Sequence, residues 1–281
     1  MSVKIIIDST VDISEKYRDR TEIVPLTVRF GNKEYRDRVD LGAREFYEKL
    51  VESDVMPSTS QANISDFAEV FEREVKNGND VVVITISSKL SGTYNSACIA
   101  AQDYSGRVFV VDSLSVSIGS GVLAEFALEL AQAGLGASDI AKRLVAERAN
   151  VKVVAMFDTL EYLKRGGRIS PSAAFAGGLL SIKPVITIRD GEIVILGKAR
   201  GSRQSNNYLI KEIENAGGID FCKPLLLGYT GFDDSVLQKY IEDSRHIWEG
   251  NTGELETAIV GSAVGTHAGP GAIAIAFYVK Q

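Results

Sequence analysis

The chain has 281 residues, of which 45% are hydrophobic and 24% are charged. A chain of this length and composition can bury a large core, in one large domain or in two. Its formal net charge of −6 argues against nucleic-acid binding over the whole surface, although it leaves room for a local basic patch. Cys98 and Cys222 form no CxxC pair, so neither a zinc site nor a disulfide framework is indicated.

The sequence offers no good candidate for a signal peptide or a membrane span. The apolar run Ile5–Ile7, which precedes Asp8, is far too short for a signal peptide. The longest uncharged stretch, Thr257–Val279, is interrupted by glycines and by Pro270, which favours a strand, a loop and a second strand. We therefore expect a cytoplasmic protein in a reducing compartment.

The first half of the chain alternates short apolar runs with helical patterns, as in an α/β fold with a mostly parallel sheet. The expected strands are Lys4–Ile7, Val81–Ile86 and Val108–Val111, and the expected helices are Ile64–Lys76 and Val122–Gln132. Each strand ends in small polar residues, at the edge where ligands bind in sheets of this kind. We predict an N-terminal three-layer α/β/α domain over residues 1–150.

Residues 151–281 are predicted to form a second α/β domain, with a mixed sheet. Its expected strands are Val151–Phe157, Leu225–Leu227 and Gly271–Val279, together with a hairpin over residues 185–196 that turns at Asp190-Gly191. Helical patterns cover Asn206–Asn215 and Ser235–Trp248. Because no low-complexity linker separates the two halves, we expect them to pack closely.

Three polar motifs are candidates for a ligand site. The loop Ser87–Thr93 joins a strand to a helix that begins near Thr93, and it offers hydroxyls beside free amides, a combination that favours anions. The cluster Pro57–Gln61 lies ahead of a helix, and His267 lies in a glycine- and proline-rich loop before the last strand. Each motif also has a plain interpretation as a cap or a loop, so only their convergence would make a site.

Several enzyme classes lack their signature in this sequence. No GxSxG pattern surrounds Ser91, and no GxxxxGK[ST] phosphate loop occurs. The segment Gly119-Ser120-Gly121 approximates a dinucleotide motif, but it falls well after a strand end and lacks the usual acidic partner. The two histidines and the pair Asp8 and Asp12 provide no recognisable set of metal ligands. We therefore expect neither a metal nor a bound cofactor.

Basic residues are concentrated between Lys164 and Arg203. Eight lysines or arginines and two acids give this segment a net charge of 8 − 2 = +6. Because the whole chain has a net charge of −6, the residues outside this segment carry a net charge of −12. Such an island on an acidic protein suggests docking to a negatively charged partner. The plain alternative is a solvated charged surface.

Seven motifs follow one another from residue 4 to the C-terminus. They are Asp8-Ser9-Thr10, Thr59-Ser60-Gln61, the segment from Ser87 to Asn95, the segment from Lys164 to Ser170, Lys183-Pro184, Ala199-Arg200 and the segment from His267 to Ala272. Together they resemble the motifs of the DegV family, whose members include the fatty-acid-binding subunit of bacterial fatty acid kinase. One departure is Ala62, where the family often has proline.

The resemblance implies a two-domain α/β protein that holds one long-chain fatty acid in an apolar tunnel between or beside its domains. In the family, hydroxyls of the TSQ and LSG motifs bind the carboxylate, with a C-terminal histidine close by. The matching residues are Thr59, Ser91 and His267, with Ser60 and Gly92 adjoining them. Acyl-chain selection would depend on side chains such as Ile99, Val116, Phe157, Phe175, Leu179 and Phe277.

The resemblance also implies a protein partner. A separate ATP-dependent kinase subunit would convert the bound acid to an acyl phosphate for phospholipid synthesis, so this chain would bind no ATP and carry no catalytic residue. The kinase or the phosphoryl group would be met by four arginines: Arg165, Arg168, Arg200 and Arg203. His267 is a candidate to assist the transfer. Membrane contact would be transient, because no amphipathic anchor or lipidation motif is apparent.

Two alternatives belong to other classes. One is a small-molecule enzyme, an acyl hydrolase or transferase, that uses Ser91 as nucleophile and His267 as base. The other is a binder of RNA or membrane through the basic island, which would show a steep salt dependence of association.

Overall fold

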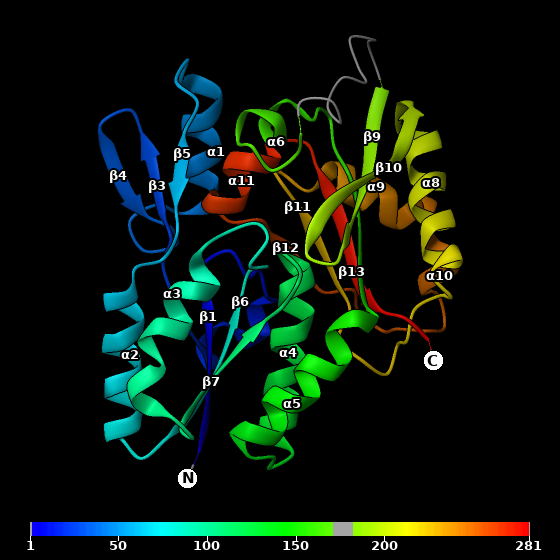
Figure 1. The fold of residues 1–281 in the computed structure, drawn as a ribbon. Helices are drawn as coiled ribbons and strands as arrows, with labels where there is room; N and C mark the ends of the chain where they lie inside the picture. Colours follow the sequence, from blue (N-terminus) through cyan, green and yellow to red (C-terminus); the bar gives the residue numbers. More distant parts are fainter. Residues whose placement is uncertain (1, 171–181, 281) are drawn as a thin grey trace.

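The computed structural model of the protein describes residues 2–170 and 182–280. Two larger sheets and one small sheet organise the described chain (Figure 1). The two larger sheets lie on opposite sides of one helix, and the small sheet lies near one end of the molecule (Figure 1). This arrangement brings the two halves of the chain into direct contact, as expected.

The first sheet is wholly parallel, in the strand order β2-β1-β6-β7. Its strands are β1 (Val3–Asp8), β2 (Thr21–Val24), β6 (Asp80–Thr85) and β7 (Val108–Asp112). Helices α2 (Ile64–Lys76) and α3 (Thr93–Ala100) cover one face, and α4 (Ile118–Gln132) and α5 (Ala137–Glu147) cover the other (Figure 1). The predicted three-layer α/β/α architecture is confirmed.

The strands of the first sheet are apolar along most of their length because helices cover both faces. In β1, Ile6 belongs to the same core cluster as Phe67 and Phe71 of α2. Its neighbours Ile5 and Ile7 point the other way, into the cluster that contains α4 and α5. The polar residues that follow β1, β6 and β7 are therefore carried to one edge of a rigid layer.

The second sheet is mixed, in the order β10-β9-β8-β13-β11-β12. Its strands are β8 (Val151–Met156), β9 (Ile182–Arg189), β10 (Glu192–Arg200), β11 (Leu226–Tyr229), β12 (Thr257–Ile259) and β13 (Ile273–Tyr278). Among its described strands, β11 and β12 pair in parallel and the other neighbours pair antiparallel, so the predicted mixed sheet is confirmed. All six strands come from Val151 onward, while a domain boundary near residue 150 stays a prediction.

Helix α4 lies between the two large sheets. Its other side faces β8, β11 and β13 of the second sheet, whose far face is covered by α8 (Gly201–Asn215), α9 (Ser235–Asp243) and α10 (Arg245–Trp248) (Figure 1). A Cβ at Gly121 would overlap the carbonyl oxygen of Asp12, and a Cβ at Gly119 would overlap Val153 of β8. The glycines that approximate a dinucleotide motif therefore serve close packing.

The small sheet is a feature that the sequence did not predict. It has the order β4-β3-β5 and consists of β3 (Thr27–Phe30), β4 (Lys33–Arg36) and β5 (Ser58–Ser60), with α1 (Ala43–Glu52) nearby. These strands have only three or four residues each, and β4 is mostly charged, so they carry little apolar periodicity. The cluster Pro57–Gln61, whose plain interpretation was a loop and a cap, thus lies largely in strand β5.

The remaining helices also depart from expectation in two places. His267 lies in the last turn of α11 (Ser262–Ala268), where a loop was predicted, and the helix expected over Ser235–Trp248 is divided at Ser244. The other short elements are α6 (Glu161–Arg165) and the 3-10 helices Glu15–Arg20, Gln102–Tyr104 and Arg148–Asn150. Across residues 2–170 and 182–280, every helix is too short or too polar to cross a bilayer.

Candidate functional site

A cavity lies between the two large sheets, beyond the carboxyl ends of the parallel strands. With the space of its open mouth included, it holds about 950 Å³. Its walls come from loops after β1, β6 and β7, from strands β5, β8, β9, β10, β11 and β13, and from α11. Ligands are expected at this edge in open α/β sheets.

Most of the cavity wall is apolar. Val116 and Ile118 line it at the start of α4, and many of the remaining apolar side chains come from the second sheet and its flanks: Val153, Ala155, Phe157, Ile186, Ile188, Ile193, Ile273 and Ala274. Of the expected tunnel residues, Val116 and Phe157 are therefore in the wall. Ile99 is 49% exposed on α3, and Phe277 packs in the core on the far face of the sheet. Phe175 and Leu179 lie outside the described residues.

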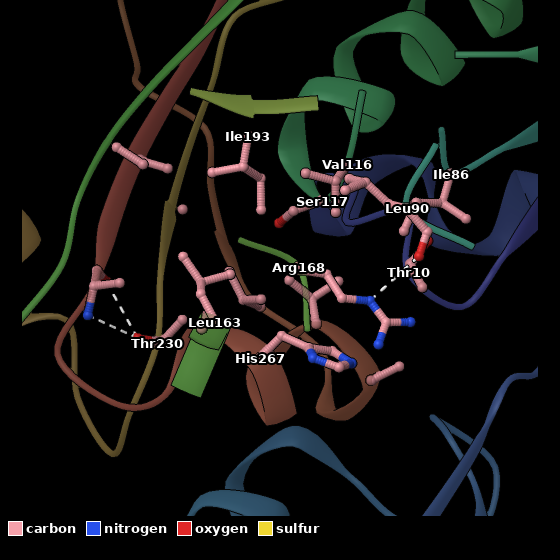
Figure 2. Close-up of a pocket in the computed structure, with 18 of the residues that line it drawn as sticks. Thr10, Ile86, Leu90, Val116, Ser117, Leu163, Arg168, Ile193, Thr230 and His267 are labelled. Carbon is pink, nitrogen blue, oxygen red and sulfur yellow. Dashed lines mark hydrogen bonds between the residues drawn. The ribbon is translucent and has the colours of Figure 1, made fainter. Parts of the chain in front are cut away.

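Polar residues from distant parts of the chain gather in the same wall. Thr59, Ser60, Ser91 and His267 all line the cavity, so four of the five residues expected to bind a head group come together. Arg168 joins them, and its guanidinium lies between His267 and the loop of Leu90 (Figure 2). Within the part of the chain that the structure describes, the wall contains no aspartate or glutamate.

His267 and Thr59 form the direct contact at this site. The Nε2 atom of His267 lies 2.9 Å from Oγ1 of Thr59, across 208 positions of sequence. The other ring nitrogen, Nδ1, is buried without a hydrogen-bond partner among the described residues. A Cβ at Gly166 would overlap Nδ1, so glycine in the RGGR segment lets the backbone of α6 approach the ring.

Burial keeps the His267 ring neutral. Desolvation, with a smaller contribution from the positive charge of Arg168, lowers the pKa of His267 to about 4. A neutral imidazole has one N–H group, and the contact with Thr59 involves Nε2. His267 and the Thr59 hydroxyl can therefore act as one hydrogen-bonded unit toward a ligand.

The side chain of Gln61 connects the segment that contains Thr59 to the residues that follow Ser91. The amide Nε2 of Gln61 donates to Oγ of Ser96 at 2.8 Å, and a Cβ at Gly92 would overlap the amide oxygen of Gln61. Gly92 thus lies beside the site as the residue that permits this approach. The hydroxyl of Ser91 lies 2.9 Å from Oγ1 of Thr93 and accepts the Thr93 N–H at 3.2 Å, just ahead of α3, whose N-cap residue is Gly92.

This arrangement does not assemble a Ser91–His267 catalytic pair. His267 directs Nε2 to Thr59, and the Ser91 hydroxyl is engaged with Thr93. A serine nucleophile needs its base within hydrogen-bond reach. The structure therefore does not show the contact between nucleophile and base on which the alternative of an acyl hydrolase or transferase depends.

The four arginines predicted to meet a partner occupy two kinds of position. Arg168 is half-buried in the cavity wall, where Nε donates to the carbonyl of Leu90 at 3.3 Å and Nη1 to that of Gly166 at 2.6 Å. Burial lowers the pKa of Arg168, and no acidic side chain among the described residues pairs with it. Arg165, Arg200 and Arg203 lie outside the wall on the exposed surface, where Arg165 pairs with Glu161.

Among the cavity residues that were not predicted as site residues are two with hydroxyl groups, Thr10 and Ser117. Thr10 belongs to the polar cluster after β1, and Asp8 of that cluster accepts the Ile86 N–H at 2.7 Å, tying the ends of β1 and β6 together. The position of Thr10 after a strand was the available signal. Ser117 has a positive φ of 56° just before α4, which the sequence does not reveal.

Comparisons with known proteins agree with the fold and the motifs. The family model described as "Uncharacterised protein, DegV family" matches residues 2–280. A DegV domain-containing protein of Caldanaerobacter subterraneus is 34% identical over 288 residues, covering 99% of each chain.

Two solved structures share the fold over the whole chain. One is from a study of fatty acid binding by a DegV family protein of Thermus thermophilus, with a TM-score of 0.88, 32% identity and full coverage of both chains. The other is a fatty acid kinase (Fak) B3 protein of Streptococcus pneumoniae loaded with linoleic acid, with a TM-score of 0.86 and 22% identity, also over both full chains. The family model and the relative of 34% identity together establish that this chain belongs to the DegV family.

Proposed function

We propose that the protein binds one long-chain fatty acid, with the acyl tail in the apolar cavity and the carboxylate at Thr59, Ser91, Arg168 and His267. One observation carries the proposal. The cavity wall is mostly apolar, and its polar part contains one arginine and no acidic side chain among the described residues. Such a wall suits an amphiphile with a negative head. The Thermus relative, a DegV protein studied for fatty acid binding, supports the same ligand class.

The energetics of this ligand favour the same arrangement. Burying a tail of about fifteen methylenes yields on the order of 12 kcal/mol of gross driving force, at about 0.8 kcal/mol per CH₂. A carboxylate transferred into the cavity without donors would cost several kcal/mol or would become protonated. The hydroxyls of Thr59 and Ser91 and the Arg168 guanidinium supply donors, so the head group can remain anionic.

We further propose that the bound carboxylate is presented to a separate ATP-dependent kinase. A carboxylate oxygen would attack the γ-phosphorus of ATP, giving an acyl phosphate and ADP for phospholipid synthesis. The exposed residues Arg165, Arg200 and Arg203 would face the negative partner or the phosphoryl group. This step, a cytoplasmic setting and transient membrane contact follow from the family resemblance, and the Fak B3 protein of the same fold is consistent with it.

Denaturing extraction and mass spectrometry of the purified protein test the ligand. We expect close to one fatty acid per chain in the wild type. Thr59→Val, which removes the hydroxyl with little change in volume, should weaken rebinding of a C16 acid by about tenfold to a hundredfold, since a hydrogen bond to a charged group contributes about 1.5–3 kcal/mol. Thr59→Ser, which keeps the hydroxyl, should bind nearly as the wild type. A protein that neither contains nor binds fatty acid would contradict the proposal.

A charge-reversal pair tests the kinase step. Arg200→Glu should lower acyl-phosphate formation by a cognate kinase without changing fatty acid affinity, because Arg200 lies outside the cavity wall. Lys142→Glu on α5 is a matched control, since Lys142 is also exposed and lies on a helix behind the first sheet. Equal rates for the two variants would argue against a docking role for Arg200.

A further inference from the structure

Helix α11 carries His267. Two buried carboxylates from the other half of the chain accept hydrogen bonds from the start of this helix. Three successive backbone N–H groups donate to them. Gly261 donates to Oδ1 of Asp12 at 3.0 Å, and Ser262 and Ala263 donate to the two oxygens of Asp37 at 3.1 and 3.2 Å. Both oxygens of Asp37 are therefore used to hold the first turn of α11.

Asp37 is itself fixed in place. Its side chain is fully buried, and its N–H donates to the Leu26 carbonyl at 2.9 Å. The next residue, Arg38, forms an ion pair with Asp12 and donates through Nε to the Ser9 carbonyl at 2.9 Å. The start of α11 is thus tied to the loop after β1, at the edge of the first sheet, and to the loop after β4 of the small sheet.

The same short helix forms part of the cavity wall along its length. Ala263, Val264, His267 and Ala268 all line the cavity, and α11 packs beside α1, α6 and the small sheet (Figure 1). A helix rises about 1.5 Å per residue, so the His267 backbone lies only about 7 Å along the axis from the amides that Asp37 holds. A shift or rotation at the start therefore moves the ring relative to Thr59.

We propose that Asp37 is a positioning residue for the fatty-acid site, which holds α11 so that Nε2 of His267 stays in contact with the Thr59 hydroxyl. The inference rests on the proposed function and adds a residue that does not line the cavity. Asp37 acts through His267 and Thr59, and it touches no ligand atom. Loss of the Asp37 carboxylate should therefore weaken ligand binding in a protein that contains His267, and should have little effect in a variant that lacks the His267 ring.

That dependence separates positioning from a general contribution to stability. Asp37→Asn keeps the volume but replaces one acceptor by an NH₂ group that faces a backbone N–H. We expect about a tenfold rise in the dissociation constant for a C16 fatty acid in the wild-type background, comparable with losses measured for supporting residues in metal sites. In the His267→Ala background, the same change should alter the constant by less than about twofold.

Glu125→Gln is the matched control. Glu125 is also a buried carboxylate that accepts a backbone N–H, from Ser14 at 2.8 Å, but it lies on α4 outside the cavity wall. We expect unchanged affinity in this variant. Equal losses from Asp37→Asn in both backgrounds, or no loss in either, would overturn the positioning role.

Two further measurements keep the test decisive. The ring resonances of His267 should shift in Asp37→Asn without ligand, while those of exposed His246, the only other histidine, stay in place. This readout tests Asp37 even if the wild type binds no fatty acid, an outcome that would contradict the proposed function alone. If Asp37→Asn does not fold, Ser262→Pro removes one donor at a helix position that favours proline. Unchanged ring resonances in that variant would also overturn the inference.

Discussion

His267 shows how burial at a single residue sets the chemistry of the site. Its ring lies against Gly166 on one edge and contacts Thr59 on the other, with Arg168 near enough to oppose a second positive charge. A neutral ring can accept or donate at Nε2 according to its tautomer, and the Thr59 hydroxyl can adopt the complementary role. A ligand carboxylate would be the first negative charge in this part of the wall.

This environment predicts an unusual titration. We expect His267 in the ligand-free protein to stay neutral until about pH 4, because the folded pKa is lowered to about 4 from the ordinary 6.5. The unfolded chain binds the proton more readily between these values, so the free energy of unfolding should fall as pH drops from about 6.5 to about 4. Histidine NMR titration and urea unfolding at several pH values measure the two effects.

A bound carboxylate should change that titration in a known direction. Its negative charge favours the imidazolium form, so the pKa of His267 should rise when fatty acid binds, and affinity should increase as the pH is lowered toward 5. The His267→Ala variant is the control, because its affinity should lose this part of the pH dependence. A ring that titrates near 6.5 without ligand would show that it is more exposed than the structure indicates.

Among the elements, the hairpin of β9 and β10 links the second sheet to the loop that carries Ser91. Its turn has positive φ values at Asp190 and Gly191, 52° and 83°, as a tight two-residue turn requires. The turn packs on the first half of the chain, where the Ser87 hydroxyl donates to the Gly191 carbonyl at 2.7 Å. The hairpin therefore closes one side of the cavity, which Ile188 and Ile193 line.

Gly191→Ala should destabilise the protein more than a positive φ alone explains. Alanine costs about 1 kcal/mol in this conformation, and a Cβ at Gly191 would also overlap the Ser87 hydroxyl. Gly134→Ala is the matched control, because Gly134 has a φ of 87° and no heavy atom within 4 Å of its Cβ position. We expect a loss of about 1 kcal/mol for Gly134→Ala and at least twice that for Gly191→Ala in urea unfolding. Equal losses would mean that the hairpin tip is free to move.

Elements with strong periodicity and turn signals were predictable, and those without them were not. The sequence predicted β1, β6 and the hairpin that turns at Asp190-Gly191. Apolar, β-branched runs and an Asp-Gly turn are properties of a few neighbouring residues, so they can be recognised in the sequence. β5 has three polar residues, and its support comes from residues distant in sequence, through pairing with β3 and through the contact of Thr59 with His267. Helix α11 was missed because a glycine and small residues weaken its pattern, while its first turn is held by carboxylates more than 220 residues away.

At the scale of the whole molecule, the site exists only because the two halves of the chain fold against one another. Residue types and strand ends indicated Thr59, Ser91 and His267, and the family resemblance joined them. No sequence property placed Arg168 in the cavity wall and Arg165 outside it, although the two lie three residues apart in one glycine-rich segment. Nor could the sequence reveal Asp37, whose partners lie 225 and 226 positions away.

The same architecture predicts how affinity depends on the acyl chain. The acyl tail and the carboxylate would contact different parts of the cavity wall. Their contributions to the binding free energy should therefore be separable in a series of saturated acids from C10 to C18. Each added methylene should tighten binding about fourfold, at about 0.8 kcal/mol per buried CH₂, until the cavity is filled and the gain ceases. Ligand-dependent thermal stabilisation measures the series, since stabilisation follows RT ln(1 + [L]/Kd).

Thr59→Val and methyl esters are the controls for the head group. Both should weaken binding by a similar factor at every chain length and leave the increment per methylene unchanged, because neither alters the apolar wall of the second sheet. An increment near zero from C10 onward would mean that the tail stays outside the cavity. Esters that bind as tightly as the acids would mean that Arg168 and the hydroxyls do not recognise the negative charge.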